Sequence, residues 1–179
     1  IRKSGIVFDK VEIEAADVPF GIGSGSGVIF GVTGGVTEAV LRRLQQGHNR
    51  VDMESIKKSG VRGDDGIKVL TYNYNGREIK AAVVNGLANA DKVLQQIKNH
   101  EAEYDFVEVM ACRRGCIMGG GQPVNAGPRT RKARMKGLYD TDVNTQIKKS
   151  NENPMILSLY DTLLKGKEHE LLHRNFSGK

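Results

Sequence analysis

Apolar runs and helical periodicities alternate along the first two thirds of the chain. Residues 27–30 form a short apolar run between glycines, which predicts a buried strand. After a glycine-rich turn, apolar side chains recur at helical spacing over residues 36–46, with Arg42 and Arg43 on the opposite face. This first block therefore predicts a strand, a turn and an amphipathic helix.

The next block predicts a hairpin, a helix and a strand. Residues 67–84 read as two strands around Asn75 and Gly76, the dipeptide that most readily takes the positive φ values of a two-residue turn. Residues 87–98 predict a helix, and residues 104–111 a strand that ends at the cysteines. The apolar stripe of that helix consists of Leu87, Ala90, Leu94 and Ile97. Strands that alternate with helices predict an α/β fold.

The two ends of the chain have a different texture. The first residues, from Ile1, resemble a strand with polar flanks, which suggests a piece of something longer. Beyond Pro128 polar and basic residues dominate, and Asn153 with Pro154 predicts a helix N-cap and first helical residue. We therefore expect a helical C-terminal extension over residues 126–179, which packs on the α/β body of residues 1–125.

Composition narrows the class of protein. Of the 179 residues 39% are hydrophobic and 27% are charged, which is ordinary for a soluble globular protein. No apolar run approaches the roughly 18 residues that span a bilayer, and no signal-peptide pattern opens the chain. These features predict a cytoplasmic protein without a membrane partner.

The net charge of +6 is concentrated in residues 129–136, which hold five basic side chains. Such a run can bind nucleic acid or an acidic protein, but a solvated helix face is the commoner explanation. No aromatic or base-reading pattern accompanies the charge, so we expect no nucleic-acid partner.

Two further motifs invite a functional interpretation. Glycines 21, 23, 25 and 27 suggest a phosphate loop, but no G-x-G-x-x-G register and no Walker lysine fits them. His169, Glu170 and His173 form an H-E-x-x-H pattern that suggests zinc, although no downstream third ligand follows. We expect instead a turn at the glycines and a helix whose Leu171 and Leu172 pack inward. His48 and His100 are expected at helix ends.

Cys112 and Cys116 are the only cysteines of the chain. A disulfide is disfavoured in a cytosolic protein, and a bridge over so short a loop would add little stability. The spacing of four residues would let both thiols face one point on a helical turn, and the nearby glycines bring N–H groups toward the sulfurs, which favours an iron-sulfur site. A 4Fe-4S cluster needs four thiolates, so the rest of the site must lie elsewhere.

Residues 108–123, EVMACRRGCIMGGGQP, resemble the third cysteine signature of the iron-only (di-iron) hydrogenases, E-x-M-A-C-x-x-G-C-x-x-G-G-G-x-P, at every fixed position. Residues 24–42, SGSGVIFGVTGGVTEAVLR, are similar to the S-G-A-G-x-I-F-G-x-T-G-G-V-M-E-A-A-x-R stretch of that family. The tail resembles the segment that is a separate small subunit in some members, which accounts for the H-E-x-x-H pattern. The chain would thus be the C-terminal part of such an enzyme.

The resemblance implies roles for individual residues. Cys112 would bind the 4Fe-4S part of the active-site H-cluster, and Cys116 would bridge that part to a di-iron subsite. Met110 would pack beside the di-iron unit. The apolar pocket around it would be lined by Phe30, Gly31 and Val36. The implied reaction interconverts protons, electrons and hydrogen gas, with ferredoxin or a nicotinamide-linked module as the electron partner.

The family's two earlier signatures, T-S-C-C-P and P-C-x-x-K, do not occur in these 179 residues. They supply the remaining cluster ligands, so the chain would need the N-terminal half of the same catalytic domain and would be inactive and without cluster alone. Arg113 and Arg114 also leave open a sensory or electron-bifurcating relative, or a hydrogenase-like protein of iron-sulfur assembly. The zinc peptidase and the basic interaction module stay as further alternatives.

Overall fold

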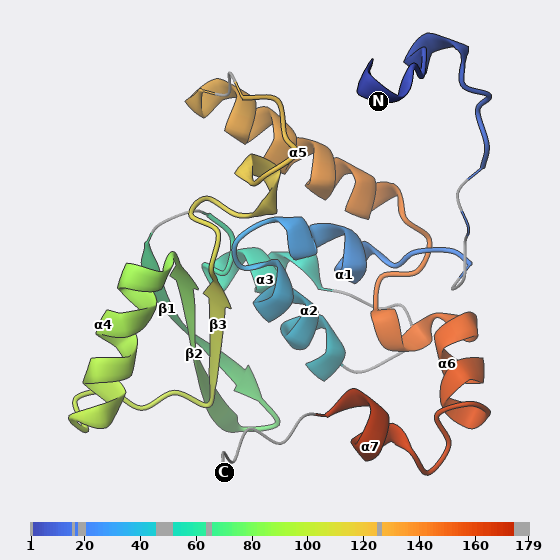
Figure 1. The fold of residues 1–179 in the computed structure, drawn as a ribbon. Coiled ribbons are helices and arrows are strands. Elements are labelled where there is room, and N and C mark those ends of the chain that lie inside the picture. The colour runs from blue at the N-terminus through green and yellow to red at the C-terminus, as the bar shows by residue number, and fades with distance from the viewer. Residues whose placement is uncertain are drawn as a thin grey trace.

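The protein is described by a computed structural model that covers residues 2–15, 17, 21–45, 52–63, 66–124 and 127–173. Its helices are α1 (Gly25–Val28), α2 (Gly35–Leu44), α3 (Met53–Lys58), α4 (Leu87–Lys98), α5 (Pro128–Asn144), α6 (Pro154–Asp161) and α7 (Glu168–Leu172). The strands are β1 (Ile67–Tyr74), β2 (Arg77–Asn85) and β3 (Phe106–Met110). The expected α/β fold with a helical C-terminal extension is confirmed (Figure 1).

A three-stranded sheet in the order β1-β2-β3 forms the centre of the fold. β1 and β2 pair antiparallel, and the turn between them has positive φ at Asn75 and Gly76, as the sequence predicts. β2 and β3 pair parallel, and α4 makes the crossover between them. β2 is therefore the central strand, and its last five residues, 81–85, are all buried.

Helices cover both faces of the sheet (Figure 1). On one face Ala82 and Val84 of β2 pack against Ala90 and Val93 of α4. Leu87 and Leu94, which the periodicity places on the buried stripe, are 66% and 62% exposed. That part of the prediction is wrong because the narrow sheet covers only part of the apolar surface of α4.

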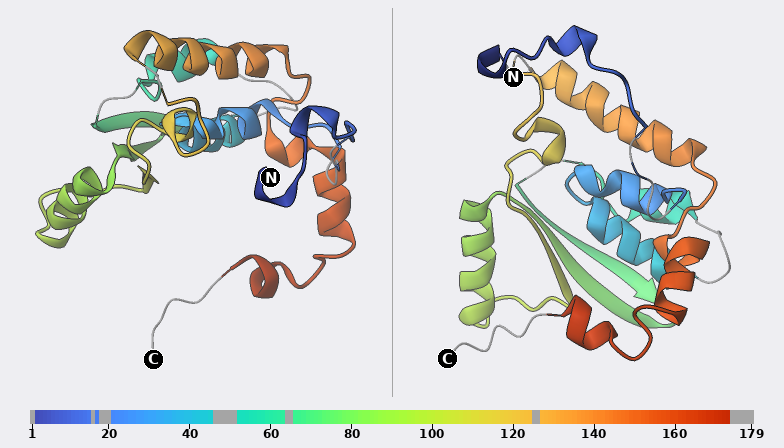
Figure 2. Two further views of the ribbon diagram at one scale, coloured as in Figure 1. Left: turned by 45° about the horizontal axis from the view of Figure 1, so that its top comes forward. Right: turned by 45° about the vertical axis from the view of Figure 1, so that its right-hand side comes forward.

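The other face of the sheet packs against α2 and α3. Leu41 of α2 and Ile56 of α3 join Val83 and other sheet residues in a second core cluster. The two turned views show α2 between the sheet and α5 (Figure 2). The amphipathic helix predicted near residues 36–46 is thus confirmed as α2, and it lies between the sheet and the C-terminal extension.

The predicted strand at residues 27–30 is wrong, because this segment forms α1 and the 3₁₀-helix η3 (Ile29–Gly31). The main-chain nitrogens of Gly25 and Ser26 donate to the carbonyls of Ile147 and Lys148, which follow α5 in the chain. A contact so distant in sequence is invisible to local periodicity. The strand expected at the N-terminus is also absent from residues 2–15, where η1 (Arg2–Ser4) and η2 (Phe8–Lys10) stand instead.

The extension packs through α5 on a third core cluster. Ile29, Val32 and Ile117 form its buried part, and Leu138 and Tyr139 of α5 pack against it. Beyond α5, η5 (Ser150–Glu152) leads into α6, and the side chain of Asn153 accepts a hydrogen bond from the main-chain nitrogen of Met155 as the predicted N-cap.

The last described helix departs from expectation. Leu171 and Leu172 of α7 are 55% and 52% exposed, so the expected inward packing is wrong. α7 lies at the edge of the fold, beyond α6 (Figure 2). His100 follows the end of α4 by two residues, and His48 lies outside the described residues.

Candidate metal centre

The two cysteines lie on the loop that leaves β3. A tight turn spans Cys112 to Gly115, closed by a hydrogen bond from the Gly115 nitrogen to the Cys112 carbonyl at 3.0 Å. Arg114 and Gly115 both have positive φ, 75° and 79°. The spacing of the cysteines predicts that they share one helical turn, and this prediction is wrong. Arg114 and Gly115 are left-handed and interrupt the helical path between the two cysteines. Cys116 begins a separate 3₁₀-helix, η4 (Cys116–Met118).

Both thiols are free, and both cysteine residues are exposed. The glycine run from Gly119 to Gly121 follows η4 and has the main-chain freedom to turn back toward the sulfurs. Two exposed thiols on one loop are available to bind a metal cluster that extends beyond this body. No group of three or more His, Cys, Asp or Glu side chains suited to a metal occurs among the described residues.

The last residue of β2 is hydrogen-bonded to the cysteine loop. The buried side-chain oxygen of Asn85 accepts a hydrogen bond from the main-chain nitrogen of Arg114 at 2.9 Å. The nitrogen of Gly86 donates to the carbonyl of Met110 at 2.8 Å. The last residue of β2 thus holds the turn at Arg114, and Gly86, the residue after it, holds the end of β3 that precedes the turn.

Glu108 of β3 ties the loop's strand to the N-terminus of α2. Its buried carboxylate accepts hydrogen bonds from the nitrogens of Gly34 and Thr37 and from the hydroxyl of Thr37, at 2.7–2.8 Å. A carboxylate is favoured there because the first N–H groups of a helix lack internal partners and carry partial positive charge. The Gly34–Thr37 turn therefore has a fixed place beside β3.

The residues expected around the di-iron unit lie on these elements. Phe30 and Gly31 belong to η3, Val36 is the second residue of α2, and Met110 ends β3. Gly31, Val36 and Met110 are half-buried, whereas Phe30 is 45% exposed. A Cβ atom on Gly115 would stand 3.1 Å from the carbonyl oxygen of Gly31, so the η3 segment touches the cysteine loop.

A buried charge cluster joins α2 to α5. Arg42 is fully buried and donates to Asp142 of α5 and to Glu38, at 2.6–2.7 Å. Burial disfavours its charged form, but the hydrogen bonds that it donates to the two carboxylates outweigh burial and raise the pKa of Arg42 above its ordinary value. Arg62 also pairs with Glu38 and stacks over the ring of Tyr139.

The zinc-like motif does not gain a third donor from the described residues. The rings of His169 and His173 stack with centroids 4.8 Å apart, and both residues are exposed.

The basic run lies on α5. Arg129, Lys132 and Lys136 are exposed as expected, whereas Arg131 and Arg134 are half-buried.

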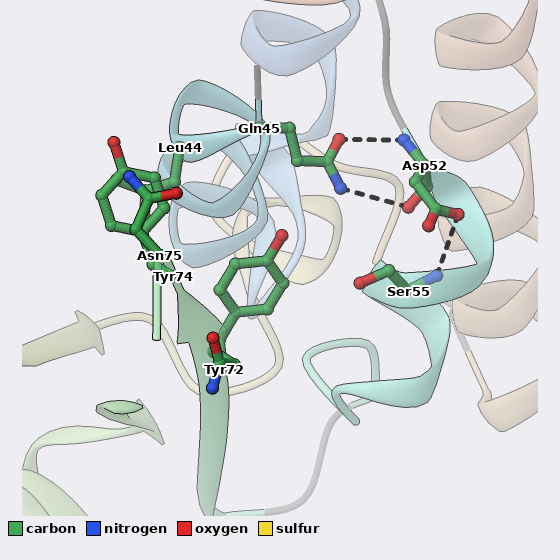
Figure 3. Close-up of a pocket in the computed structure, with 8 residues that line it drawn as sticks. Leu44, Gln45, Asp52, Ser55, Tyr72, Tyr74 and Asn75 are labelled. Carbon is green, nitrogen blue, oxygen red and sulfur yellow. Dashed lines mark hydrogen bonds between the residues drawn. The ribbon is translucent and has the colours of Figure 1, made fainter. Parts of the chain in front are cut away.

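A pocket lies between the end of α2, α3 and β1. It is lined by Gln45, Asp52 and Tyr72, and none of the predicted site residues lines it (Figure 3).

Comparison with known proteins decides the family. The family model of the iron only hydrogenase large subunit, C-terminal domain, matches residues 1–120, and that of the iron hydrogenase small subunit matches residues 128–179. The chain belongs to the iron-only hydrogenase family. Both family models lie on one chain here, and they meet close to the start of α5.

Relatives of this iron-only hydrogenase chain are much longer than 179 residues. Iron hydrogenase 1 of Clostridium pasteurianum is 37% identical over 97% of this chain and 32% of its own length. The large subunit of a periplasmic Fe hydrogenase of Nitratidesulfovibrio vulgaris is 42% identical over 71% of this chain and 30% of its own. The chain therefore spans about a third of the length of these curated relatives.

Solved structures agree with the family. An FeFe-hydrogenase of Chlamydomonas reinhardtii is 33% identical, with a TM-score of 0.59 over 95% of this chain and 51% of that one. A more distant relative, Protein NAR1 of Arabidopsis thaliana, is 24% identical over 92% of this chain and 36% of its own length.

Three residues around the cysteine loop of this hydrogenase chain have contacts that the sequence does not predict: Glu108, Asn85 and Arg134. Glu108 stands in the quoted signature, and its place on a strand that ends at the cysteines is a signal for a buried anion. Asn85 directly follows the predicted hairpin of residues 67–84, where a polar side chain after apolar residues is a weaker signal. Arg134 lies in the basic run and has no local signal, because its partners lie elsewhere in the fold.

Among the described residues no helix is long and apolar enough to cross a membrane.

Proposed function

We propose that this chain is the C-terminal part of an enzyme that interconverts protons plus electrons and hydrogen gas. The observation that supports this best is the cysteine loop, because a specific family signature coincides with two free, exposed thiols. In the proposal Cys112 binds the 4Fe-4S part of the H-cluster and Cys116 bridges it to the di-iron subsite. The bound cluster supplies the redox and hydrogen chemistry.

The donors in this chain fit half of such a site. Thiolates are the ligands of iron-sulfur clusters, and a cubane takes four. The chain holds two cysteines. In the proposal the other ligands come from the N-terminal half of the same catalytic domain, and residues 1–179 alone bind no cluster and are inactive.

Met110, Phe30, Gly31 and Val36 have a role in excluding water in this proposal. They lie on β3, η3 and α2, the three elements that Glu108 and the Gly31–Gly115 contact hold around the loop. Apolar groups and a thioether there would keep the di-iron ligands dry, with Met110 beside the di-iron unit. The closeness of these elements supports the assignment.

Exposed apolar side chains support a large partner body. Phe8 is 71% exposed and Ile13 fully exposed, and residues 2–15 run outside the main body (Figure 1). Apolar surface of this kind marks an interaction site. We infer that the N-terminal half of the catalytic domain covers part of it. Ferredoxin or a nicotinamide-linked module is the proposed electron partner, and the cytoplasm is the proposed location.

The second candidate is an iron-sulfur protein with a sensory or assembly role and no hydrogen chemistry. The similarity to curated cytosolic Fe-S cluster assembly factors favours it, because two of them align with 80% of this chain, although at lower identity than the hydrogenases. Met110 favours the hydrogenase, because a thioether at that place serves a di-iron unit.

The test uses the native gene product that contains residues 1–179, matured with the di-iron cofactor. We expect infrared bands of iron-bound CO and cyanide, together with hydrogen evolution from reduced methyl viologen. Cys116→Ser should remove the infrared bands, and Cys112→Ser should lower the iron content. Glu103→Gln is the control, because this exposed carboxylate lies outside the cysteine signature.

The outcomes separate the two candidates. Iron and sulfide in cubane amounts, without CO and cyanide bands, would favour the assembly or sensory protein. Uptake of zinc that is lost with His173→Ala but kept with Cys112→Ser would overturn both in favour of a peptidase.

A further inference from the structure

The glycine segment after Cys116 has a flexible main chain unless contacts from other parts of the protein hold it. Residues 119–121 are three consecutive glycines, and glycine loses more conformational freedom on ordering than any other residue. Gly120 and Gly121 have no atom within 4 Å of the place where a Cβ would stand. Gly121 also has a positive φ of 87°. Packing around Gly120 and Gly121 therefore does not hold this part of the loop.

One side chain from α5 spans the two ends of this segment. The guanidinium of Arg134 donates through Nη1 to the carbonyl of Ile117 at 2.7 Å and through Nη2 to the carbonyl of Pro123 at 3.4 Å. Nη1 also lies 3.8 Å from the sulfur of Met118. The planar fork of arginine thus closes the glycine loop from both sides, beginning at the residue directly after Cys116.

α5 holds Arg134 in place through the same face of the helix. Leu138, one turn further along, packs against the buried cluster of Ile29 and Ile117. Asp142, two turns along, forms the buried ion pair with Arg42. Residues at spacings of four share a helix face, so these three contacts fix the position of α5 against the loop.

We propose that Arg134 is a positioning residue for Cys116: its guanidinium keeps the turn that carries this thiol rigid, so that the thiol is presented in one orientation. The value of that orientation for a cluster rests on the proposed function. The rigidity of the turn does not, because it follows from the contacts of this chain alone.

The first measurement is amide hydrogen exchange on the native gene product that contains residues 1–179, prepared without any metal. Arg134→Gln should accelerate exchange in residues 117–122 by roughly tenfold, the fold-change that corresponds to losing one charged hydrogen bond. Arg134→Lys should recover part of the protection, since an ammonium still donates to one carbonyl. Lys132→Gln, on the exposed side of α5, is the matched control and should leave exchange unchanged.

The second measurement uses the native gene product loaded with cluster. Arg134→Gln should shift the infrared bands of iron-bound CO and speed the loss of iron to a chelator, and Arg134→Lys should reverse both in part. Unchanged exchange in residues 117–122 would show that Arg134 does not hold the loop; we call this contact of Arg134 with the carbonyls of Ile117 and Pro123 the clamp. Faster exchange with unaltered bands and iron loss would overturn its role for Cys116. If the wild-type protein takes up no iron, the proposed function fails, while the exchange result still decides the clamp.

Discussion

Glu108 accepts hydrogen bonds from both the main-chain nitrogen and the hydroxyl of Thr37, each at 2.7 Å. The pair joins the strand that ends at the cysteines to the helix that begins beside them, across 71 residues of chain. Because the carboxylate is buried, it contributes more than an exposed hydrogen bond of the same length.

Glu108→Ala should lower the free energy of unfolding by about 3 kcal/mol, because buried donors are left without an acceptor. Glu108→Gln keeps the shape and should lose about half as much. Urea denaturation measures both. Glu103→Gln, an exposed carboxylate before β3, is the control and should change little. Equal losses at both positions would contradict the anchoring role.

Asp142→Asn should destabilise the protein by about 3 kcal/mol, since removing one partner of a buried ion pair leaves charge uncompensated. Arg42 keeps Glu38 as a partner, so the loss lies at the low end of the usual range. Asp140→Asn is the control on the same helix, because its ion pair with Lys136 is exposed. Thermal and urea unfolding should separate the two variants. A small loss for Asp142→Asn would show that the ion pair does not anchor α5.

Tyr139 should make the free energy of unfolding fall at alkaline pH. Burial and the charge of Glu38 raise the pKa of its hydroxyl above the ordinary value, although Arg62 opposes them. The unfolded chain loses this proton at lower pH than the folded one, so stability is full below about pH 10 and falls as pH rises further. Absorbance of tyrosinate should show that Tyr139 loses its proton late in an alkaline titration.

Tyr139→Phe removes a buried hydroxyl that has no hydrogen-bond partner among the described residues. We expect stability at pH 7 to be unchanged or slightly higher, and the late titration to disappear. Tyr160→Phe, at an exposed position, is the control. A large loss of stability in Tyr139→Phe would mean that the hydroxyl does have a partner.

Arg114 adopts a left-handed conformation that disfavours any side chain with a Cβ. Arg114→Gly should therefore raise the free energy of unfolding by about 0.5–1 kcal/mol, the strain relieved less the entropy of glycine. Arg113→Gly is the neighbouring control without a positive φ and should lower it by a similar amount. Changes of the same sign in urea unfolding would refute the argument from strain.

Gly115 combines a positive φ with close contact. An added methyl group would stand 3.1 Å from the Gly31 carbonyl oxygen, so Gly115→Ala should cost about 2 kcal/mol and push η3 from the cysteine loop. Gly120→Ala meets open space and should be neutral within about 0.5 kcal/mol. Unfolding curves of the two variants test the difference. A neutral Gly115→Ala would argue against the η3 contact.

Local patterns predicted those parts of the fold whose partners are near in sequence. Asn75 and Gly76 determine the hairpin because the turn needs positive φ values that they adopt at low cost. α4 and β3 follow from periodicity over a dozen residues or fewer. The run at residues 27–30 was misread because an apolar segment of four residues suits a buried helix as well as a buried strand.

The face of α5 that packs against the body was beyond reach of the sequence pattern. Arg134 and Asp142 are polar, so the helix has no apolar stripe to mark the side that is buried. Their partners, a carbonyl after Cys116 and the guanidinium of Arg42, come from segments up to 100 residues away. The sequence pattern therefore favours a solvated helix face for the basic run, whereas in the structure Arg134 binds the loop.

Signatures and turn residues act through local chemistry, so the family and most of the strands and helices can be predicted from the amino-acid sequence. The two cysteines are predicted as ligands in the same way. The way in which their loop is held depends instead on contacts of the folded chain: Asn85 bonds the loop at Arg114, Glu108 joins β3 to α2, and Arg134 bonds the loop from α5. These contacts join segments distant in the chain, and a hydrogen bond between two such segments exists only once both have folded.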